Sequence, residues 1–381
     1  MAIVMKLALV CDDLIQNGGA ERVLDFVSQM FPDAPIYTSV ATEHWLNLFR
    51  KRGHTVRTSF LQKLPFATYL NRVYSVFFLH IFAFESFDLS NYDIVLSLSS
   101  RYAHFVITKP STTHICYCHS PGRMFWEPFS YFERESFGGV SFLRGLARLF
   151  LQIPLSFLRI MDYVAAQHVD YFIANSVVAK NRIKKYYGRD SKVINPFSDI
   201  TVSFQNSVKD SNYFLVLTRL AAWKRVDIAV AACTKLGLKL KVIGKGPDLP
   251  HLKRFAGPTV QLMGFVSEQE KLNLLANCTA LINTQFEDFG IVPVEAMALG
   301  KPVIAYRKGG ALETIVAGKT GEFFDYQIPE NLAETLKNFN ATNYSSDDCR
   351  KQAVKFTKTH FKAQLLKFLA DVVSASARYG K

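Results

Sequence analysis

Short runs of apolar residues alternate with longer segments of helical period along most of the chain. Apolar runs bounded by turn residues predict strands, and apolar positions three and four apart predict helices. In the first half we expect strands at 6–11, 35–38, 94–98, 105–108, 114–118 and 171–174, and helices at 21–30, 146–168 and 176–187, the last capped by Ser176.

The alternation lapses at 195–212, where Pro, Ser, Asn and Asp dominate, and then restarts. The second half predicts strands at 213–218, 239–243, 260–263, 280–283, 302–305 and 322–324, and helices at 226–236, 249–256, 268–277, 292–299 and 362–377. Such alternation is typical of parallel sheets covered by helices on both faces. We therefore predict an α/β chain of two Rossmann-like, doubly wound domains. They are expected at 1–197 and 198–361, with a ligand cleft at the carboxyl ends of their strands.

The net charge of +13 indicates an acidic partner. No nucleic-acid motif appears, so nucleic acid is disfavoured. Residues 45–84 and 142–159 mix basic and aromatic residues, which suits a segment lying on an anionic membrane surface. Both segments also fit core helices with solvated basic faces, and that alternative stays open. Neither holds the roughly 18 uncharged apolar residues that a spanning helix needs.

The cysteine spacing matches neither a metal site nor a redox motif, which favours reduced thiols and a cytoplasmic location. The first residues reach an acidic pair too soon for a signal peptide, and they fit a first buried strand. Neither a second histidine nor a carboxylate lies at metal-ligand spacing from His119. We therefore expect no metal and no cofactor.

The most informative segment is 286–298, which follows a predicted strand and opens a helix. Gly290 occupies the turn and Pro293 the first helical turn, so free amides at the helix start provide a seat for phosphate. Glu287 and Glu295 are eight residues apart, about 12 Å along a helix. That distance exceeds the roughly 5–9.5 Å of a glycosidase pair. The two glutamates are expected to contact different parts of one extended ligand.

Two further turns follow strands of the same predicted domain. Arg219 and Lys224 end the first strand, and a guanidinium with an ammonium suits a diphosphate. A solvated basic turn is the alternative if this pair stands alone. Gly244 lies in a glycine turn after the next strand, and a glycine turn in isolation is weak evidence for a ligand site.

The first predicted domain has two candidate segments at strand ends. Gly18 and Gly19 follow the first strand without the full dinucleotide fingerprint, so a plain strand-to-helix turn remains the alternative. His119 fits a hydrogen bond to a sugar hydroxyl or to a reacting phosphate, and equally a buried histidine bonded to backbone. Trp126, with Arg123 beside it, fits stacking on a sugar on the acceptor side.

With these motifs the chain resembles the family 4 retaining glycosyltransferases of the GT-B fold, over nearly its whole length. It is similar to bacterial mannosyl- and glucosyltransferases of O-antigen and exopolysaccharide synthesis. The resemblance is carried by Gly-Gly-Ala-Glu-Arg at 18–22, Cys-His-Ser-Pro at 118–121, Arg219 with Lys224, and the Glu287–Glu295 block. It implies that residues 362–381 form a helix that crosses back to complete the first domain.

The resemblance also implies roles for individual residues. Glu287 would contact the transferred sugar, Glu295 the ribose, and Arg219 and Lys224 the diphosphate. The implied catalytic set is His119, Glu287, Arg219 and Lys224, and the implied donor-binding set is Gly18, Gly19, Gly244, Phe265, Val266, Phe289, Gly290, Ile291 and Glu295.

The expected activity is transfer of a hexose from UDP-glucose or GDP-mannose to a glycan or a polyprenyl-diphosphate-linked acceptor. Arg219, Lys224 and the helix start would stabilise the charge that grows on the leaving diphosphate, without a metal. Two alternatives remain: a nucleotide-sugar epimerase on the same fold, and an inactive scaffold at the membrane periphery.

Overall fold

The computed structural model describes residues 5–128, 141–200 and 212–378 of the chain, which divides into two compact units. Unit 1 comprises the described residues up to Ile194 together with 362–378, and unit 2 the described residues from Asn195 to Phe361. The sequence placed the first boundary at 197/198. Part of the expected linker, 201–211, lies outside the described residues.

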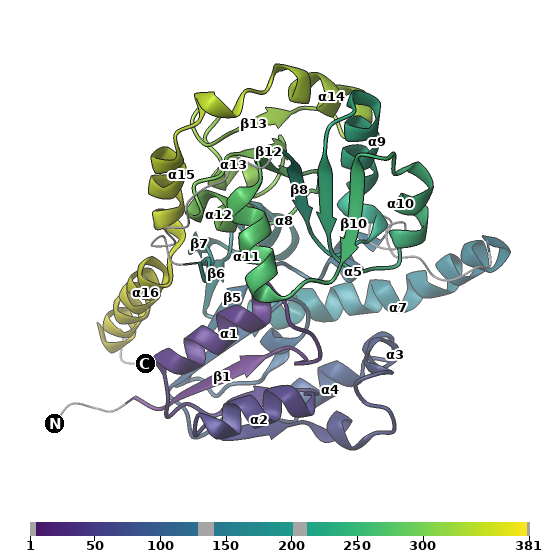
Figure 1. Cartoon of the computed structure of the whole chain (residues 1–381). Helices are drawn as coiled ribbons and strands as arrows, with labels where there is room; N and C mark the ends of the chain where they lie inside the picture. The colour runs from purple at the N-terminus through teal and green to yellow at the C-terminus, as the bar shows by residue number, and fades with distance from the viewer. Residues whose placement is uncertain (1–4, 129–140, 201–211, 379–381) are drawn as a thin grey trace. The chain divides into compact units, whose positions relative to one another are not determined.

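Unit 1 is built on a parallel sheet of order β3-β2-β1-β4-β5-β6-β7 (Figure 1). Its strands are β1 Leu7–Cys11, β2 Ile36–Thr38, β3 Val56–Thr58, β4 Ile94–Ser99, β5 Thr113–Cys118, β6 Tyr171–Ala174 and β7 Ser191–Val193. Its helices are α1 Gly19–Met30, α2 Glu43–Lys51, α3 Asn71–Val76, α4 Leu79–Glu85, α5 Arg123–Trp126, α7 Ser141–Gln167, α8 Val177–Tyr187 and α16 Lys358–Arg378, with 3-10 turns η1 Phe60–Lys63 and η2 Ala103–Phe105. The predicted N-cap of α8 is confirmed, because Ser176 Oγ accepts the Ala179 amide at 3.1 Å.

One predicted strand in unit 1 is wrong. Residues 105–108 do not form a strand, and the 3-10 turn η2 ends at Phe105. The backbone amides of residues 100–103 instead donate to the Asp12 carboxylate, which bends the chain into a loop. Two strands were missed, β3 and β7, and each is a three-residue strand at an edge of the sheet.

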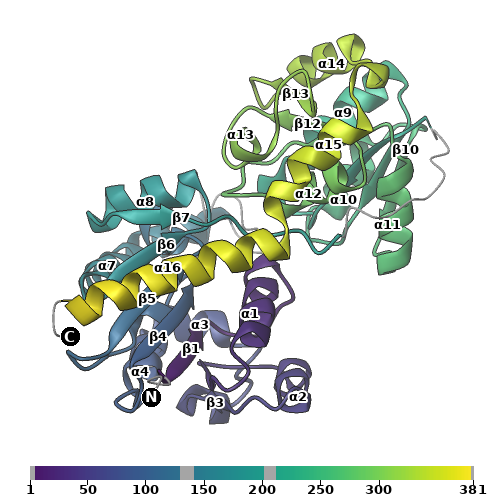
Figure 2. The ribbon, with the colours of Figure 1, turned by 90° about the vertical axis from the view of Figure 1, so that its left-hand side faces the viewer.

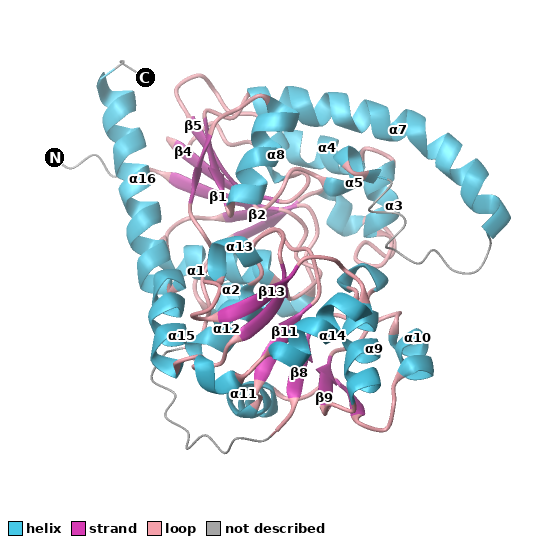
Figure 3. Cartoon of the chain, turned by 90° about the horizontal axis from the view of Figure 1, so that it is seen from above, coloured by secondary structure: helices cyan, strands magenta, loops and turns pink. Residues whose placement is uncertain are grey.

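Unit 2 is built on a second parallel sheet, of order β10-β9-β8-β11-β12-β13. Its strands are β8 Phe214–Leu217, β9 Leu240–Ile243, β10 Val260–Gly264, β11 Ala280–Asn283, β12 Val303–Tyr306 and β13 Gly321–Phe324. Its helices are α9 Val226–Leu236, α10 Leu249–Phe255, α11 Glu268–Asn277, α12 Ile291–Ala298, α13 Ala311–Thr314, α14 Pro329–Asn338 and α15 Ser346–Ala353, with the 3-10 turn η3 Ala222–Lys224. Figure 3 shows helices on both sides of the strands.

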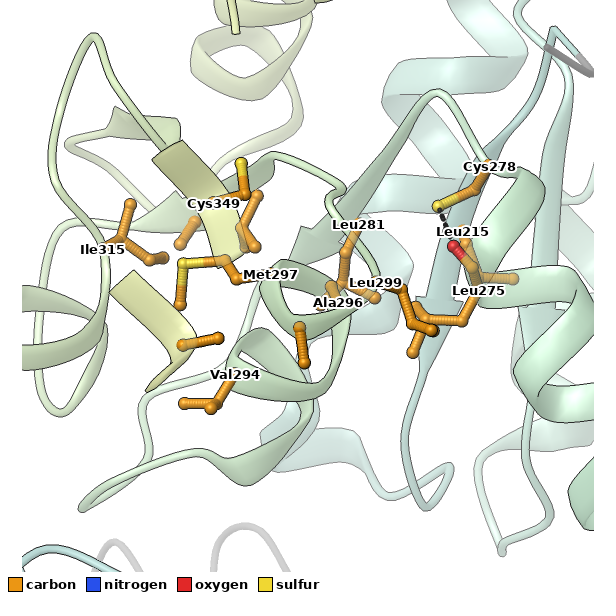
Figure 4. Packing of buried hydrophobic residues seen from close by; sticks show 14 of the residues in the cluster. Leu215, Leu275, Cys278, Leu281, Val294, Ala296, Met297, Leu299, Ile315 and Cys349 are labelled. Atoms are coloured by element: carbon orange, nitrogen blue, oxygen red, sulfur yellow. Dashed lines mark hydrogen bonds between the residues drawn. The ribbon is translucent and has the colours of Figure 1, made fainter. Parts of the chain in front are cut away.

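Two apolar clusters cover the faces of this second sheet. Phe214 and Val216 pack with α9, α10 and α14, whereas Leu215 packs with α11, α12 and α15. Successive strand residues point to opposite faces, so both faces of the sheet are buried. Helix α12 is enclosed in the second cluster, where Val294, Ala296 and Met297 are buried (Figure 4). This packing fixes the helix that carries Glu295.

Helix α16 completes unit 1, as the resemblance implied. From Lys362 onward its residues group with unit 1, and Figure 2 shows the helix lying along that unit. The ring of Phe368 meets Tyr171 of β6 edge-on, with 6.4 Å between ring centroids. Leu365 and Leu369 are buried, so an apolar side of α16 packs onto the unit.

Candidate functional site

The candidate site lies in unit 2 at the carboxyl ends of β8 and β11. In the strand order β9-β8-β11-β12, the chain steps from β8 outward to β9 on one side and from β11 outward to β12 on the other side. The strand order therefore reverses between β8 and β11. A parallel sheet opens a crevice at such a point, and ligands of doubly wound sheets bind there. The segment 218–225 follows β8 and the segment 284–290 follows β11, so both predicted clusters reach this crevice.

Lys224 and Glu287 form an ion pair at the centre of this site. Lys224 ends the turn η3 and its side chain is 8% exposed, while the Glu287 side chain is 22% exposed. The ammonium also lies 4.0 Å from the ring centroid of Trp223. An ammonium carries three donors, so Lys224 can bond Glu287 and an anionic ligand at the same time.

A small hydrogen-bond network ties the two segments together. Thr218 Oγ1 donates to Gln285 Oε1 at 2.9 Å, and Thr284 Oγ1 donates to the Lys224 carbonyl at 2.9 Å. Gln327 Nε2 donates to the Thr284 carbonyl at 2.7 Å. The first two bonds join the segments after β8 and β11, so they fix the spacing between Lys224 and Glu287, and the third ties Thr284 to the segment after β13.

Close backbone approach explains two glycines near the site. Gly244 has φ +149°, and a Cβ there would lie 1.8 Å from the Thr218 carbonyl oxygen. A Cβ on Gly310 would lie 2.0 Å from the Phe289 carbonyl oxygen, and the Gly310 amide donates to the Glu287 carbonyl at 2.9 Å. Only glycine permits such contacts. The lack of a side chain at Gly244 therefore lets its backbone pack against the loop that follows β8. This geometry alone does not assign Gly244 a role in ligand binding.

Gly290 stands at the start of α12, with φ +84°. A Cβ at this position would meet Glu287 Oε2 at 3.1 Å, so the Glu287 carboxylate lies directly over the glycine. Ile291 begins the helix and is half-buried. Phe289 is buried and its ring packs edge-on against Phe356, 5.5 Å between centroids, so its side chain anchors the loop in the core.

Glu295 is the second glutamate of the block and is buried within α12. The Lys271 ammonium, on α11, lies 3.8 Å from Glu295 Oε2 and 2.6 Å from Glu268 Oε1. Lys271 is itself buried. Sequence analysis missed this lysine, because the helix 268–277 reads as a surface helix rich in polar residues.

The remaining unit 2 candidates differ in exposure. Arg219 is exposed, and no ion pair joins it to any residue that the structure describes. Phe265 follows β10 with 76% of its surface exposed, and the Lys245 ammonium lies 5.3 Å from its ring centroid. Val266 is half-buried against the α11–α12 cluster. Arg219 and Phe265 are therefore open to a ligand.

His119, the unit 1 catalytic candidate, follows β5 and is half-buried. Its amide donates to the Ser99 carbonyl at 2.8 Å, and its ring meets Tyr117 edge-on at 5.1 Å. The structure therefore places His119 at the carboxyl edge of the unit 1 sheet, as predicted.

The other unit 1 candidates make contacts within the unit. The Gly18 amide donates to Glu21 Oε2 at 2.9 Å, and Gly19 begins α1. Trp126 stacks on Tyr186, with centroids 4.8 Å apart. Its indole N–H donates to Asp162 at 2.6 Å, so one ring face and the N–H already have partners. Arg123 is half-buried at the start of α5.

Among the residues that the structure describes, no group of three or more His, Cys, Asp or Glu is placed to hold a metal. The donor set at the crevice is instead cationic, with Arg219 and Lys224 on one segment. A nucleotide diphosphate fits such a set directly, since both cations donate hydrogen bonds to phosphate oxygens.

Comparisons with known proteins point to glycosyltransferases. Residues 199–356 match the family model described as Glycosyl transferases group 1. An uncharacterized glycosyltransferase of Methanocaldococcus jannaschii is 28% identical over 177 residues, 45% of this chain and 50% of its own length. The alpha-1,3/1,6-mannosyltransferase ALG2 of Homo sapiens is 34% identical over 123 residues, 31% of this chain and 28% of its own. Among solved structures, Anabaena HepE in complex with UDP has a TM-score of 0.68 at 18% identity, covering 96% of this chain and all of its own.

Most of unit 2 thus matches a glycosyltransferase group 1 model, and the fold of the chain is that of the GT-B glycosyltransferases, two Rossmann-like α/β domains. The chain spans about half the length of the first of these curated relatives and less of the second.

Proposed function

We propose that this chain is a retaining family 4 glycosyltransferase that transfers a hexose from a nucleoside diphosphate sugar to a glycan or lipid-linked acceptor. One observation carries the proposal. Lys224, Arg219 and the Gly290 turn meet the crevice at the β8–β11 switch point of a glycosyltransferase group 1 domain. Two cations and a helix start at one crevice suit a diphosphate leaving group.

The proposed chemistry is mainly electrostatic. As the sugar–phosphate bond breaks, negative charge grows on the diphosphate and positive charge on the sugar. Arg219 and Lys224 stabilise the first, and Glu287, placed beside Lys224, contacts the sugar. With two cations in this role the reaction needs no metal ion. In a retaining reaction the acceptor hydroxyl enters on the face that the diphosphate leaves, and His119 is proposed to reach the donor sugar from unit 1.

The proposed donor is either GDP-mannose or UDP-glucose. The mannosyltransferase among the relatives favours mannose, while a solved structure of similar fold holds UDP. The proposed acceptor is a polyprenyl-diphosphate-linked glycan in cell-surface polysaccharide synthesis, at the cytoplasmic face of an anionic membrane. All six cysteines are free and buried, as the cytoplasmic proposal expects.

A thermal-shift screen tests the donor site. The purified chain is heated with GDP-mannose, UDP-glucose, UDP-galactose, UDP-N-acetylglucosamine and the free diphosphates, with and without a chelator. A ligand at about 100 times its dissociation constant stabilises the fold by roughly 2.7 kcal/mol. We expect one base family to stabilise the wild type with chelator present and to have no effect on Lys224→Met.

Turnover then separates the enzyme from the inactive alternative. Release of the diphosphate from the donor that binds, together with the anomeric configuration of the product, tests transfer and retention. No stabilisation by any nucleotide contradicts the donor site. Stabilisation without turnover on any lipid-linked or soluble glycan acceptor favours the scaffold.

A further inference from the structure

Helix α7 has an apolar stripe on its exposed side. Ile153, Phe157, Ile160 and Val164 are 76%, 48%, 61% and 44% exposed. At 3.6 residues per turn these four positions fall within about 60° of one another around the helix. The opposite side is buried by residues such as Leu158. A surface helix normally turns polar residues to water, so this stripe indicates a surface that meets an apolar partner.

A second group of exposed aromatic residues adjoins the stripe. Phe66 and Tyr69, before α3, and Phe77, directly after it, are 75%, 85% and 65% exposed. The ring of Phe78 meets that of Phe157 edge-on, 5.0 Å between centroids, which joins this segment to α7. Figures 1 and 3 both show α3 and α4 beside α7. We call the α7 stripe with these three residues the aromatic face.

The backbone holds these aromatic residues in unusual conformations. Phe66 and Phe78 have φ values of 50° and 62°, in the left-handed region that a bulky residue rarely adopts. Side-chain bonds brace the segment, because Tyr74 donates to the Pro65 carbonyl at 2.7 Å and Tyr102 to the Ser75 carbonyl at 2.9 Å. Strain kept at an exposed, braced segment points to a function for that segment.

Basic residues outnumber acidic ones in the sequence that carries Phe66, Tyr69 and Phe77. Residues 56–85 contain Arg57, Lys63 and Arg72 and one acidic residue, Glu85, at the end of α4. The acidic residue in the sequence of α7, Asp162, is buried and accepts hydrogen bonds from Trp126 and Tyr187. An apolar surface in a segment with an excess of basic residues is complementary to a partner that is both apolar and anionic. A second copy of the chain would bring like charges together, which opposes association.

Among the described residues, none of the helices is long and apolar enough to span a membrane.

We propose that the aromatic face docks unit 1 onto a bilayer containing anionic lipids, with the exposed apolar side chains entering the headgroup boundary. Aromatic and apolar side chains backed by basic residues bind such interfaces, and the two contributions add. This inference deepens the proposed function by naming the surface on which a lipid-linked acceptor is met. It does not depend on the donor site, because its residues lie in unit 1.

Vesicle sedimentation tests the proposal with the full chain. Wild type is compared on phosphatidylcholine vesicles with and without phosphatidylglycerol, at low and high salt. We expect binding to the anionic vesicles alone, weakened by salt. The double variants Ile153→Ser/Ile160→Ser and Phe66→Ser/Phe77→Ser are expected to lose about tenfold or more of this binding.

Matched controls make the result specific. Tyr326→Ser and Leu312→Ser remove unit 2 side chains that are 68% and 55% exposed, and they should bind vesicles as wild type does. Nucleotide affinity in solution should be unchanged in every variant, which separates this inference from the donor site. Failure of wild type to bind anionic vesicles overturns the proposal, as does full binding by both double variants. A dimer that dissociates in the double variants would assign the face to a second copy instead.

Discussion

The first six strands of unit 1 and the six strands of unit 2 follow the same order, but different groups follow the first strand of each: a buried carboxylate in unit 1, and a lysine and an arginine in unit 2. In unit 1 the switch point lies between β1 and β4, and in unit 2 between β8 and β11. After β1, the Asp12 carboxylate accepts the backbone amides of residues 100–103, at 2.6–3.0 Å. After β8, Lys224 and Arg219 reach the crevice instead.

This difference explains which unit is suited to a phosphate group. Successive backbone amides at a loop form an anion site, and in unit 1 the chain's own carboxylate occupies it. Asp13 adds a second acid there, paired with Arg101. In unit 2 the corresponding edge carries cations and the glycine turn that opens α12. The fold alone supplies two crevices, and the residues after the strands decide which one presents cations.

The largest expected effect follows from removing charge at the unit 2 switch point. Lys224→Met and Glu287→Gln should each lower the rate of sugar transfer by about 10²–10³, since the proposed function puts Lys224 at the leaving diphosphate and Glu287 at the sugar. Initial rates with the donor found by thermal shift measure this. Lys235→Met, an exposed lysine near the end of α9, serves as control and should retain the wild-type rate. Wild-type rates in both site variants would place the reaction elsewhere.

Removing the charge of the Asp12 carboxylate should lower the stability of the folded chain and leave nucleotide affinity unchanged. Asp12→Asn replaces a carboxylate oxygen by an amide N–H group that faces backbone donors. We expect a loss of about 3 kcal/mol in the free energy of unfolding, because buried amides lose a charged acceptor. Urea unfolding measures the loss, and Asp33→Asn, at an exposed site, is the control. A nucleotide affinity changed by the Asp12 variant would mean that the two switch points are not independent.

Acidification should also act selectively on unit 1. Burial lowers the pKa of His80 to about 4 and that of His114 to about 3. Both values lie below the pKa of an unfolded histidine, so the unfolded chain binds these protons more tightly. Stability therefore falls as pH drops below about 6.5.

His104 has the opposite effect. Burial alone would lower its pKa, but the hydrogen bond and charge of Asp162 raise that pKa instead, so His104 contributes stability that is lost as pH rises.

The variant His80→Phe isolates one of these groups. It keeps the stacking on Tyr102, whose ring centroid lies 5.1 Å away, and removes the titration. At pH 5 the variant should lose about 2 kcal/mol less than wild type does, relative to pH 7.5. His251→Gln, at a half-exposed side chain of unit 2, should show the acid sensitivity of wild type. Equal acid sensitivity in all three proteins would mean that His80 does not titrate on unfolding.

The sequence predicted unit 2 better than unit 1 for a physical reason. Strands such as Phe214–Leu217 are buried on both faces, so they appear as continuous apolar runs between turn residues. The missed strands of unit 1, Val56–Thr58 and Ser191–Val193, are edge strands with a basic residue at the centre, and neither gives an apolar run. The false strand at 105–108 is apolar because Phe105 and Val106 are buried in a loop.

At the candidate site, residues that directly follow strands were predictable, and residues placed by packing were not. Lys224 and Glu287 were expected on one ligand because parallel strands end at a common edge, but their ion pair depends on the loop geometry. The hydrogen bonds from four backbone amides to Asp12 were not predicted, because residues 100–103 follow Asp12 by about 90 positions in the sequence. Lys271 was missed because its burial comes from contact between α11 and α12.

The smallest expected effect concerns that lysine. Glu295 is buried, and a buried carboxylate needs a partner of opposite charge. Lys271 lies 3.8 Å from it and is held by Glu268 at 2.6 Å, so it is placed to orient Glu295 without touching a ligand itself. If Glu295 binds ribose hydroxyls, Lys271→Met should weaken nucleoside diphosphate binding about tenfold, near 1.4 kcal/mol.

A ribose-specific measurement decides whether Lys271 acts through Glu295. Wild type should bind the nucleoside diphosphate more tightly than its 2′-deoxy analogue, and Lys271→Met should lose that preference while Lys271→Arg keeps it. Lys253→Met, at an exposed site on α10, should keep it as well. If Glu295→Gln abolishes the preference and Lys271→Met does not, the lysine only stabilises the surface of α11. If neither variant changes it, Glu295 does not bind the ribose, and the cations after β8 remain as the unit 2 feature that selects an anionic ligand.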